Sequence, residues 1–414
     1  MGISLGLVGL GSFGSCFADL FMRHPLVDRI ALCDQEPERI KKFSEKESWK
    51  KKLNKKNIYH SHDEICKSDL DALVIITQPW LHAPQCVQAM ESGKHVYSAV
   101  PIISIPDADE ILDWCCKIVD TSRRTGMSYM LGETTFYRPK AMFCRRKAAE
   151  GAFGDFVYAE GEYFHDVDAG CSLRKVQEAR ESSKSGREWA EKAKHEYRRR
   201  GVKSGPMHYP THSVSGPVCV MRAHAVKVTA YGYANKNNDP FFDDSAFSNE
   251  MALFKMSNGA TVRICEFREC AGKLGKEEET FRIAGTRGTF TEDEGDKGVF
   301  YNNNRTAPLT ASPLSAEVLT ADQMRDPLPP EVREEFKKVQ HEATGKLSED
   351  FVPTGHGGSH PYLVHEFVDA VANRRQPAIN AWEAVRYMAM GAMAHKSALK
   401  DGETLDVPDW GDAP

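Results

Sequence analysis

The sequence predicts an α/β protein in two parts: a doubly wound parallel sheet over residues 1–130, then an α+β domain with a mostly antiparallel, open sheet over residues 131–414. The first prediction rests on short apolar runs that alternate with amphipathic stretches, the pattern of strands joined by crossover helices. The second rests on strand-like runs that follow one another without helices between them, which is typical of antiparallel pairing.

The glycines near the start of the chain predict a nucleotide-binding turn of the Rossmann type. They have the spacing G-x-G-x-x-G and lie between an apolar run at 5–10 and a helical stretch at 15–22. The first glycine permits the tight turn, the second lets a pyrophosphate approach the backbone, and the third lets helix and strand pack closely. The helix N-terminus also faces the negative charge. Five residues of this turn are expected to contact the dinucleotide: Gly9, Gly11, Ser12, Phe13 and Gly14.

An acidic residue favours NAD over NADP. The second predicted strand, 30–33, ends in Asp34, 20 residues after Gly14. A carboxylate in this place can accept hydrogen bonds from the adenosine ribose and would repel a 2′-phosphate. The alternative is a glycine-rich loop without a ligand.

The rest of the first part alternates regularly. We expect strands at 71–77, 95–98 and 128–131, and helices at 84–92 and 107–125. Ligands of doubly wound sheets bind at the carboxyl ends of the strands, so four further residues are expected beside the cofactor: Thr77, Pro79, His82 and Pro101. For His82 we expect a contact with the nicotinamide ribose; the alternative is a structural role at the start of a helix.

The second part is predicted to contain strands at 156–165, 225–234, 251–256, 261–267, 281–284 and 288–291. Asn258-Gly259 is a strong hairpin signal between two of them. Two segments fit less well. Residues 172–204 are charged and predict a solvated helical insertion, with a lid as the alternative; residues 303–355 are Pro-rich and predict a long irregular excursion. Two helices, 361–373 and 382–400, close the chain and could pack back on the first domain.

Composition argues against several classes of protein. The chain is 41% hydrophobic and 27% charged with a net charge of -5, so neither nucleic acid nor a membrane is expected as a partner. The Lys-rich patch at 50–56 is expected to be a solvated loop. Eleven scattered cysteines without a C-x-x-C pair predict a reducing cytoplasm and no metal site. We expect neither a signal peptide nor a transmembrane segment.

Several motifs resemble the Gfo/Idh/MocA family of nicotinamide-dependent sugar oxidoreductases. Besides the glycine motif, these are a strand that ends in Thr-x-Pro followed by His, and G-K-H-V-x-x-x-x-P at 93–101. The catalytic triplet of that family is Glu-Lys-Pro, but this chain has Ala99-Val100-Pro101. Valine cannot transfer a proton as the lysine does, which argues against simple dehydrogenation of the family type.

One branch of this family also lacks the lysine and includes NAD-dependent alpha-N-acetylgalactosaminidases. The chain resembles that branch at Gly132-Glu133, at 161–166, at 208–212 (H-Y-P-T-H) and at 355–358. The resemblance implies that Tyr209 and His212 transfer protons. It also implies four residues that contact the sugar: Glu133, Tyr163, His165 and His208.

The chemistry of that branch is hydrolysis through transient oxidation. A ketone at C3 acidifies the C2 proton, whose removal expels the C1 substituent; water then adds and the hydride returns. A histidine with a pKa near neutrality suits the hydroxyl proton, and a tyrosine whose pKa is lowered by a nearby cation suits the carbon proton. Tyr209 and His212 would share one side of a helix start. They could instead only cap and pack a helix, and His208 with His212 could be metal ligands, although no third ligand is evident.

These observations predict an NAD-dependent enzyme that acts on a carbohydrate, either a glycosidase or a dehydrogenase that releases NADH at each turnover. A nucleotide-binding protein without catalysis is the remaining alternative. We also expect a homo-oligomer, formed through a face of the second sheet that helices leave uncovered.

Overall fold

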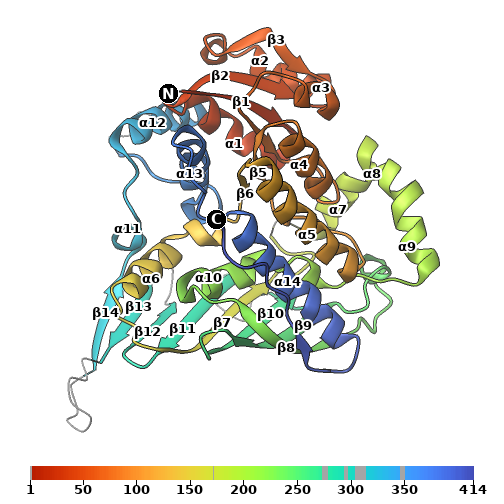
Figure 1. Ribbon diagram of the computed structural model, residues 1–414, viewed down its shortest axis with the longest axis vertical. Coiled ribbons are helices and arrows are strands. Elements are labelled where there is room, and N and C mark those ends of the chain that lie inside the picture. Colours follow the sequence, from red (N-terminus) through yellow and green to blue (C-terminus); the bar gives the residue numbers. More distant parts are fainter. Residues whose placement is uncertain (1, 171, 273–277, 293–296, 304–313, 346–349) are drawn as a thin grey trace.

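The computed structural model describes residues 2–170, 172–272, 278–292, 297–303, 314–345 and 350–414. It contains two sheets with helices packed between and around them (Figure 1). Among the described residues, no helix has both the length and the apolar composition needed to cross a membrane.

The first sheet has six parallel strands in the order β3-β2-β1-β4-β5-β6. Its strands are β1 (Ile3–Val8), β2 (Val27–Cys33), β3 (Leu53–Tyr59), β4 (Ala72–Ile75), β5 (His95–Ser98) and β6 (Tyr129–Leu131). The strands β1 and β4 are buried throughout, as strands covered on both faces should be. The order reverses between β1 and β4, which makes their carboxyl ends the switch point where such sheets bind ligands. The predicted doubly wound sheet is therefore confirmed.

The helices that connect these strands are α1 (Ser12–Arg23), α2 (Pro37–Ser44), α3 (His62–Cys66), α4 (His82–Glu91) and α5 (Ala108–Thr125). Local signals fix the longest one. The side chain of Asp107 accepts hydrogen bonds from two backbone N–H groups at the start of α5, and Gly126 ends it with φ +71°. Such capping residues account for the helix that the sequence predicts at 107–125.

The Lys-rich patch at 50–56 is not only a loop, so that prediction is wrong in part. Lys55 and Lys56 lie within β3, the edge strand of the first sheet, where charged side chains are exposed. Lys52 donates hydrogen bonds to the carbonyl oxygens of Met22 and His24. An edge strand tolerates and often carries lysines. For this reason a lysine-rich sequence can form a strand although its composition suggests a loop.

The second sheet has nine strands in the order β14-β13-β12-β11-β7-β10-β9-β8-β15. They are β7 (Phe156–Phe164), β8 (Ala225–Tyr233), β9 (Asn249–Met256), β10 (Thr261–Phe267), β11 (Glu279–Gly285), β12 (Gly288–Glu292), β13 (Gly298–Asn302), β14 (Ser315–Leu319) and β15 (Leu405–Asp406). Among the described strands of this sheet, only β7 and β10 pair in parallel, so the predicted mostly antiparallel sheet is confirmed. Gly259, with φ +88°, makes the turn between β9 and β10.

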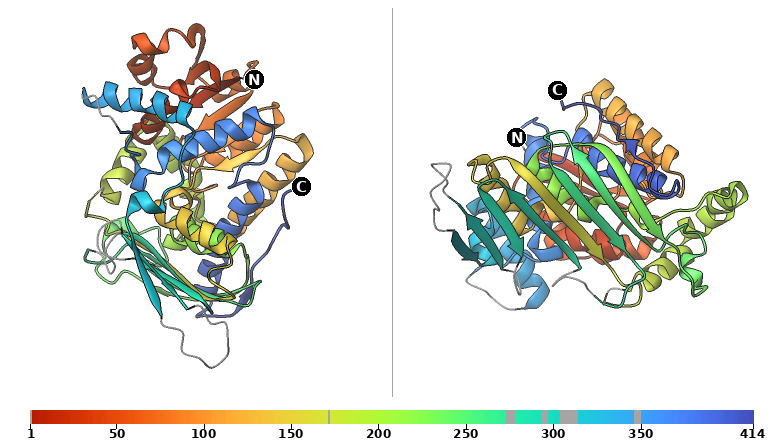
Figure 2. Two further views of the ribbon diagram at one scale, coloured as in Figure 1. Left: turned by 90° about the vertical axis from the view of Figure 1, so that its left-hand side faces the viewer. Right: turned by 90° about the horizontal axis from the view of Figure 1, so that it is seen from below.

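Helices cover one face of this second sheet. α6 (Pro139–Ala149), α10 (Thr211–Met221) and α14 (Ala381–Ala398) lie on that face, and α14 also packs on α5 of the first domain. α13 (His360–Ala372) packs on α1. The other face of the sheet turns toward the viewer in the right panel of Figure 2.

The excursion expected at 303–355 contains regular structure in its described part. After β14 come α11 (Ala321–Met324) and α12 (Pro330–Thr344), while 304–313 and 346–349 lie outside the described residues. Pro330 occupies the first turn of α12, where its missing N–H costs nothing. Only Val332 and Phe336 of this helix are buried, so its sequence shows a weak helical period.

The insertion at 172–204 is helical, as predicted, but it packs against the first domain. It consists of α7 (Leu173–Ser182), α8 (Lys184–Trp189), a short π-helix (Ala190–Lys194) and α9 (His195–Arg200). The rings of Trp189 and Trp80 stack at 5.2 Å. Arg200 forms ion pairs with Asp107 and Glu110 at the start of α5. Aromatic stacking and ion pairs therefore hold this segment beside α4 and α5 (Figure 1).

Candidate active site

The first part of the site is a cradle at the carboxyl ends of β1 and β4. Gly9 has φ +90°, and a Cβ there would lie 2.2 Å from the carbonyl oxygen of Ile76. A Cβ at Gly14 would lie 2.1 Å from the carbonyl oxygen of Gly9. A Cβ at Gly11 would meet no atom within 4 Å, so the N-terminus of α1 has open space above it. These glycines provide the tight turn and the free helix end that a pyrophosphate requires.

Asp34 completes the cradle. One of its oxygens accepts a hydrogen bond from the N–H of Leu10 at 2.7 Å, and the other from the N–H of Glu36 at 2.9 Å. These bonds hold the carboxylate beside the glycine turn, and each oxygen keeps a lone pair for a ribose hydroxyl. Arg39 lies 3.5 Å from the carboxylate.

His82 links two loops in this structure. Its Nδ1 lies 2.9 Å from the carbonyl oxygen of Pro101, and its Nε2 lies 3.2 Å from that of Thr77. The ring is 1% exposed, and burial lowers the pKa of His82 to about 4, so it is neutral. Both nitrogens face the backbone, an arrangement that supports the structural alternative rather than the expected ribose contact.

The second part of the site forms where the end of the first sheet meets α10 (Figure 1). Glu133 follows β6, and its Oε1 accepts hydrogen bonds from Nδ1 of His212 at 3.0 Å and from the N–H of Thr135 at 2.8 Å. Its Oε2 accepts no hydrogen bond from the described residues. Tyr209 precedes α10, His212 lies in its first turn, and their ring centroids are 5.5 Å apart.

The protonation of His212 differs from the prediction. Burial alone would lower the pKa of His212, but the carboxylates of Glu133 and Glu279 outweigh it and raise this pKa to about 9. Glu279, at the start of β11, lies 3.8 Å from the ring. Without further charges in the site, His212 is therefore an imidazolium at neutral pH, and the prediction of a near-neutral histidine is wrong.

The expectation for Tyr209 also needs correction. Burial raises the pKa of Tyr209, and the positive charges of Arg180 and Arg268 only partly oppose this. The phenol is therefore neutral, and it donates a hydrogen bond to the carbonyl oxygen of Val100 at 3.3 Å. A cation is nearby, as expected, but burial is the larger effect.

Two more of the expected sugar contacts join this cluster. Tyr163 lies on β7, and its hydroxyl is 2.6 Å from Nδ1 of His165. The rings of Tyr163 and His212 have centroids 5.3 Å apart. Glu133, Tyr163 and Tyr209 thus lie around His212, and His165 joins them through Tyr163.

His208 lies away from this cluster. Its ring packs against the ring of His395 at 4.3 Å, and burial lowers the pKa of His208 well below its usual value. Within the described ranges, no three His, Cys, Asp or Glu residues lie close enough together to bind a metal ion. The pairing of His208 with His212 as metal ligands finds no support in this geometry.

Comparison with known proteins yields two family models. One, described as "Oxidoreductase family, NAD-binding Rossmann fold", the Gfo/Idh/MocA model, matches residues 3–119; the other, "Glycosyl hydrolase 109, C-terminal domain", matches residues 276–413.

The chain combines a Gfo/Idh/MocA NAD-binding domain with a glycosyl hydrolase 109 C-terminal domain. NAD is accordingly its cofactor, and the glycine turn, the free end of α1 and the carboxylate of Asp34 fit it.

Individual relatives agree with this combination. A glycosyl hydrolase family 109 protein of Stenotrophomonas maltophilia is 25% identical over 99% of this chain and 89% of that protein. An alpha-N-acetylgalactosaminidase of Tannerella forsythia is 24% identical over 81% of this chain and 70% of that enzyme. The solved structure of levoglucosan dehydrogenase with NADH and L-sorbose has a TM-score of 0.71 at 16% identity, covers 99% of this chain and 100% of that chain, and shares the fold.

Two residues of this candidate site carry no signal in the sequence. Arg138, at the start of α6, pairs with Glu279 at 2.7 Å. Burial opposes ionisation of Glu279, but Arg138 and His212 outweigh it and lower the pKa of Glu279 to about 2. No local motif marks these two residues, because only the tertiary fold brings them to His212.

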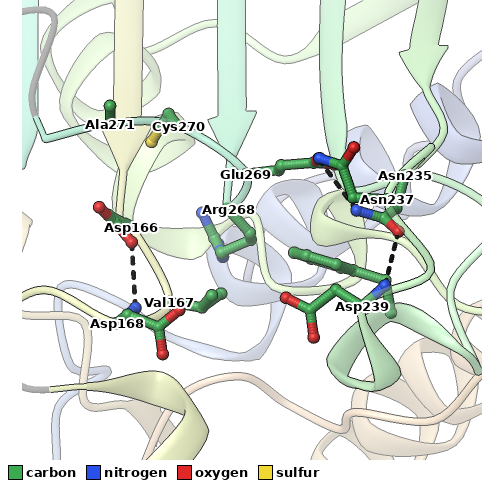
Figure 3. A pocket seen from close by; sticks show the side chains of 11 residues that line it. Asp166, Val167, Asp168, Asn235, Asn237, Asp239, Arg268, Glu269, Cys270 and Ala271 are labelled. Carbon is green, nitrogen blue, oxygen red and sulfur yellow. Dashed lines mark hydrogen bonds between the residues drawn. The ribbon is translucent and has the colours of Figure 1, made fainter.

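A cavity of about 410 Å³ adjoins this cluster (Figure 3). Arg268 forms part of its wall, lies 4.4 Å from the centre of the Tyr163 ring, and donates a hydrogen bond to Glu266 at 2.6 Å. Carboxylates and amides form one part of the lining: Asp166, Asp168, Asn235, Asn237, Asp239 and Glu269. Val167, Phe242, Cys270 and Ala271 form the other part. The cavity therefore offers both hydrogen-bonding groups and apolar surface, as a sugar ring requires.

Proposed function

We propose that this protein is an NAD-dependent glycosidase that works by transient oxidation at C3 of the sugar. The observation that carries the proposal is the position of the proton-transfer groups. The loop that holds the catalytic lysine in the Gfo/Idh/MocA pattern has the buried Val100, whereas His212, with Glu133 and Tyr209, lies in the site from the other domain.

Bound NAD supplies the group that takes up a hydride from C3 and later gives it back. His212 must be neutral for this step, so the positive charge of bound NAD⁺ would have to offset the raised pKa of His212. In that form His212 would accept the proton of the C3 hydroxyl as the alcohol becomes a ketone. Glu133 holds the imidazole through its Nδ1, which leaves Nε2 toward the substrate. Glu133 and Glu279 stabilise the imidazolium that results.

The ketone makes the neighbouring C2–H acidic. We assign the removal of this proton to the ionised form of Tyr209, which Arg180 and Arg268 favour but which burial disfavours more strongly. The electron pair left at C2 forms the C1–C2 double bond and expels the aglycone with the C1–O bond electrons. Water then adds at C1, C2 regains a proton, and C3 regains the hydride and the proton held by His212. The net reaction is hydrolysis.

Other residues of the cluster would hold the sugar. The free Oε2 of Glu133 can accept a hydrogen bond from a hydroxyl or amide, and Tyr163 with His165 offers a linked pair of polar groups beside His212. A contact between His208 and the sugar remains a prediction, and the packing of His208 against His395 does not favour it. We place the cofactor in residues 1–130 and the sugar mainly on residues 131–414.

A screen of aryl glycosides with and without added NAD⁺ tests this function. An aryl alpha-N-acetylgalactosaminide is the first substrate to try, because relatives of this chain bear that activity in their names. A substrate deuterated at C2 should lose its label to water, and NADH should not accumulate. Stoichiometric NADH on a free sugar, with the label retained, would assign the protein as a dehydrogenase instead.

We also propose a homo-oligomer formed through the uncovered face of the second sheet. Tyr231 and Met251 are opposite each other on β8 and β9, and they are exposed together with Tyr233 and Leu253. Four large apolar side chains on one face of two paired strands favour burial against a second copy of the chain.

A cytoplasmic location is part of the same proposal. The cysteines in the described part of the chain are free thiols. Unpaired thiols are typical of a reducing compartment.

A further inference from the structure

Three arginines beside the cluster and the cavity are each paired with carboxylates. Arg138 pairs with Glu279, and Arg268 pairs with Glu266. On the insertion, Arg174 pairs with both Asp168 and Asp239 at the edge of the polar cavity. Each of these guanidinium groups is neutralised by a carboxylate, as charges in a partly desolvated site usually are.

Arg180 differs from these three arginines. It lies near the end of α7, is half-buried, and its guanidinium has neither a hydrogen bond nor an ion pair with any described residue. Its charge acts on both His82 and Tyr209, which flank the loop at Val100-Pro101. The unpaired charge of Arg180 therefore acts where this loop meets Tyr209.

The position of Arg180 is held from both ends of α7. At the first turn, Arg174 joins the helix to the cavity wall through Asp168 and Asp239. Just after the last turn, the hydroxyl of Ser183 bonds to the carbonyl oxygen of Arg180 and lies 3.4 Å from Nε2 of Gln78, in the loop that follows β4. The stacked rings of Trp80 and Trp189 form a further contact between the insertion and this loop. These contacts hold the end of α7, which carries Arg180, against the loop that follows β4.

We infer that Arg180 recognises an anionic group on the substrate, so that the enzyme prefers a sugar bearing a carboxylate or a sulfate ester over the neutral sugar. This inference rests on the proposed function only for the identity of the ligand as a sugar. A planar guanidinium binds a carboxylate or sulfate with two parallel hydrogen bonds. Arg138, Arg174 and Arg268 are already paired with protein carboxylates, whereas the charge of Arg180 is available for a ligand to neutralise.

Calorimetry on the NAD-loaded protein tests this inference with six probes. They are galactose and glucose, their uronic acids, and their 6-sulfates. We expect at least one anionic sugar to bind about tenfold or more tighter than its neutral parent, the scale of a hydrogen bond to a charged group. Comparison of the uronates with the sulfates identifies which anion is preferred.

Three variants test whether Arg180 causes the preference for anionic sugars. Arg180→Gln should lose it, and Arg180→Lys should retain part of it, because lysine keeps the charge without the planar fork. Arg199→Gln, an exposed residue of the same insertion that pairs with Glu196, should keep it in full. NAD affinity should be the same in all four proteins.

The inference is overturned if no anionic sugar binds more tightly than its neutral parent, including by failing to bind at all, or if Arg180→Gln keeps the preference. It is also overturned if Arg180→Gln weakens NAD binding while sugar binding is unchanged, because Arg180 would then face a cofactor phosphate. Failure of the proposed function would appear separately, as retention of the C2 label and absence of glycoside cleavage in a protein that still binds the anionic sugar.

Discussion

Replacing Glu133 by Gln should convert His212 from an imidazolium into a neutral imidazole at pH 7. Glu133 Oε1 lies 3.0 Å from Nδ1 of His212, and both side chains are buried. At an effective dielectric constant of 20, two unit charges at this separation attract each other by about 5 kcal/mol. The pKa of His212 is raised from 6.5 to about 9, which corresponds to about 3 kcal/mol. Loss of the Glu133 charge is large enough to remove that increase, so we expect this pKa to fall below 6.5.

The measurement is an NMR titration of protein labelled with ¹³C at the histidine Cε1 position. The chain has 15 histidines, and the signal of His212 is assigned by its absence in His212→Ala. The free energy of unfolding should also depend on the protonation of His212. Because the folded pKa lies above the unfolded one, His212 stabilises the native state fully below pH 6.5, and this contribution is lost as the pH rises through 9. The free energy of unfolding, measured by thermal unfolding, should therefore fall by about 3 kcal/mol between pH 6.5 and 10 in the wild type. It should not fall in this way in Glu133→Gln.

A second buried pair provides the matched control. Glu250 contacts His395 at 2.7 Å in the interior of the second domain, so Glu250→Gln removes a comparable contact elsewhere and should leave the titration of His212 unchanged. A wild-type pKa near 6.5 for His212, or one that does not change in Glu133→Gln, would refute the assignment of this pair.

Three other results are expected. His212→Ala and Tyr209→Phe should each lower the rate of glycoside cleavage by about 10² to 10⁴, the scale of a lost proton-transfer group, with NAD affinity unchanged in calorimetry; a loss below tenfold would assign a packing role. Asp34→Ala should weaken NAD⁺ binding by roughly 1–3 kcal/mol, and wild-type protein that binds NADP⁺ as tightly as NAD⁺ would contradict our account of Asp34. Leu253→Glu should dissociate the oligomer in light scattering, whereas Leu399→Glu, at a similarly exposed leucine outside that sheet face, should not; a monomeric wild type at micromolar concentration would end this proposal.

Local signals are sufficient for most of the fold. The boundaries of α5 follow from its capping residues Asp107 and Gly126, and the hairpin of β9 and β10 follows from Asn258-Gly259. The errors occur where an element buries few side chains. The edge strand β3 and the helix α12 show almost no apolar period, so their sequences resemble loops.

The candidate site is only partly predictable for a different reason. Tyr209 and His212 are close in sequence, and the H-Y-P-T-H motif marks both of them. Arg138 and Glu279 are far apart in the chain and meet only in the folded protein. Motifs identify side chains, but the pKa values of those side chains depend on such distant partners. For this reason the motif places His212 in the cluster but does not reveal its protonation.

The raised pKa of His212 bears on the choice between glycosidase and dehydrogenase. A base that takes the C3 proton in a buried site, flanked by Glu133 and Glu279, will hold that proton rather than release it to solvent. The positive nicotinamide ring of oxidised NAD, when bound next to His212, would lower the pKa of His212, and this charge would disappear when the ring takes up the hydride. His212 is then a good base before oxidation and a good store of the proton afterwards. A net dehydrogenase must discard one proton per turnover, whereas a redox-neutral hydrolase must return it to C3. The carboxylates around His212 favour the second case.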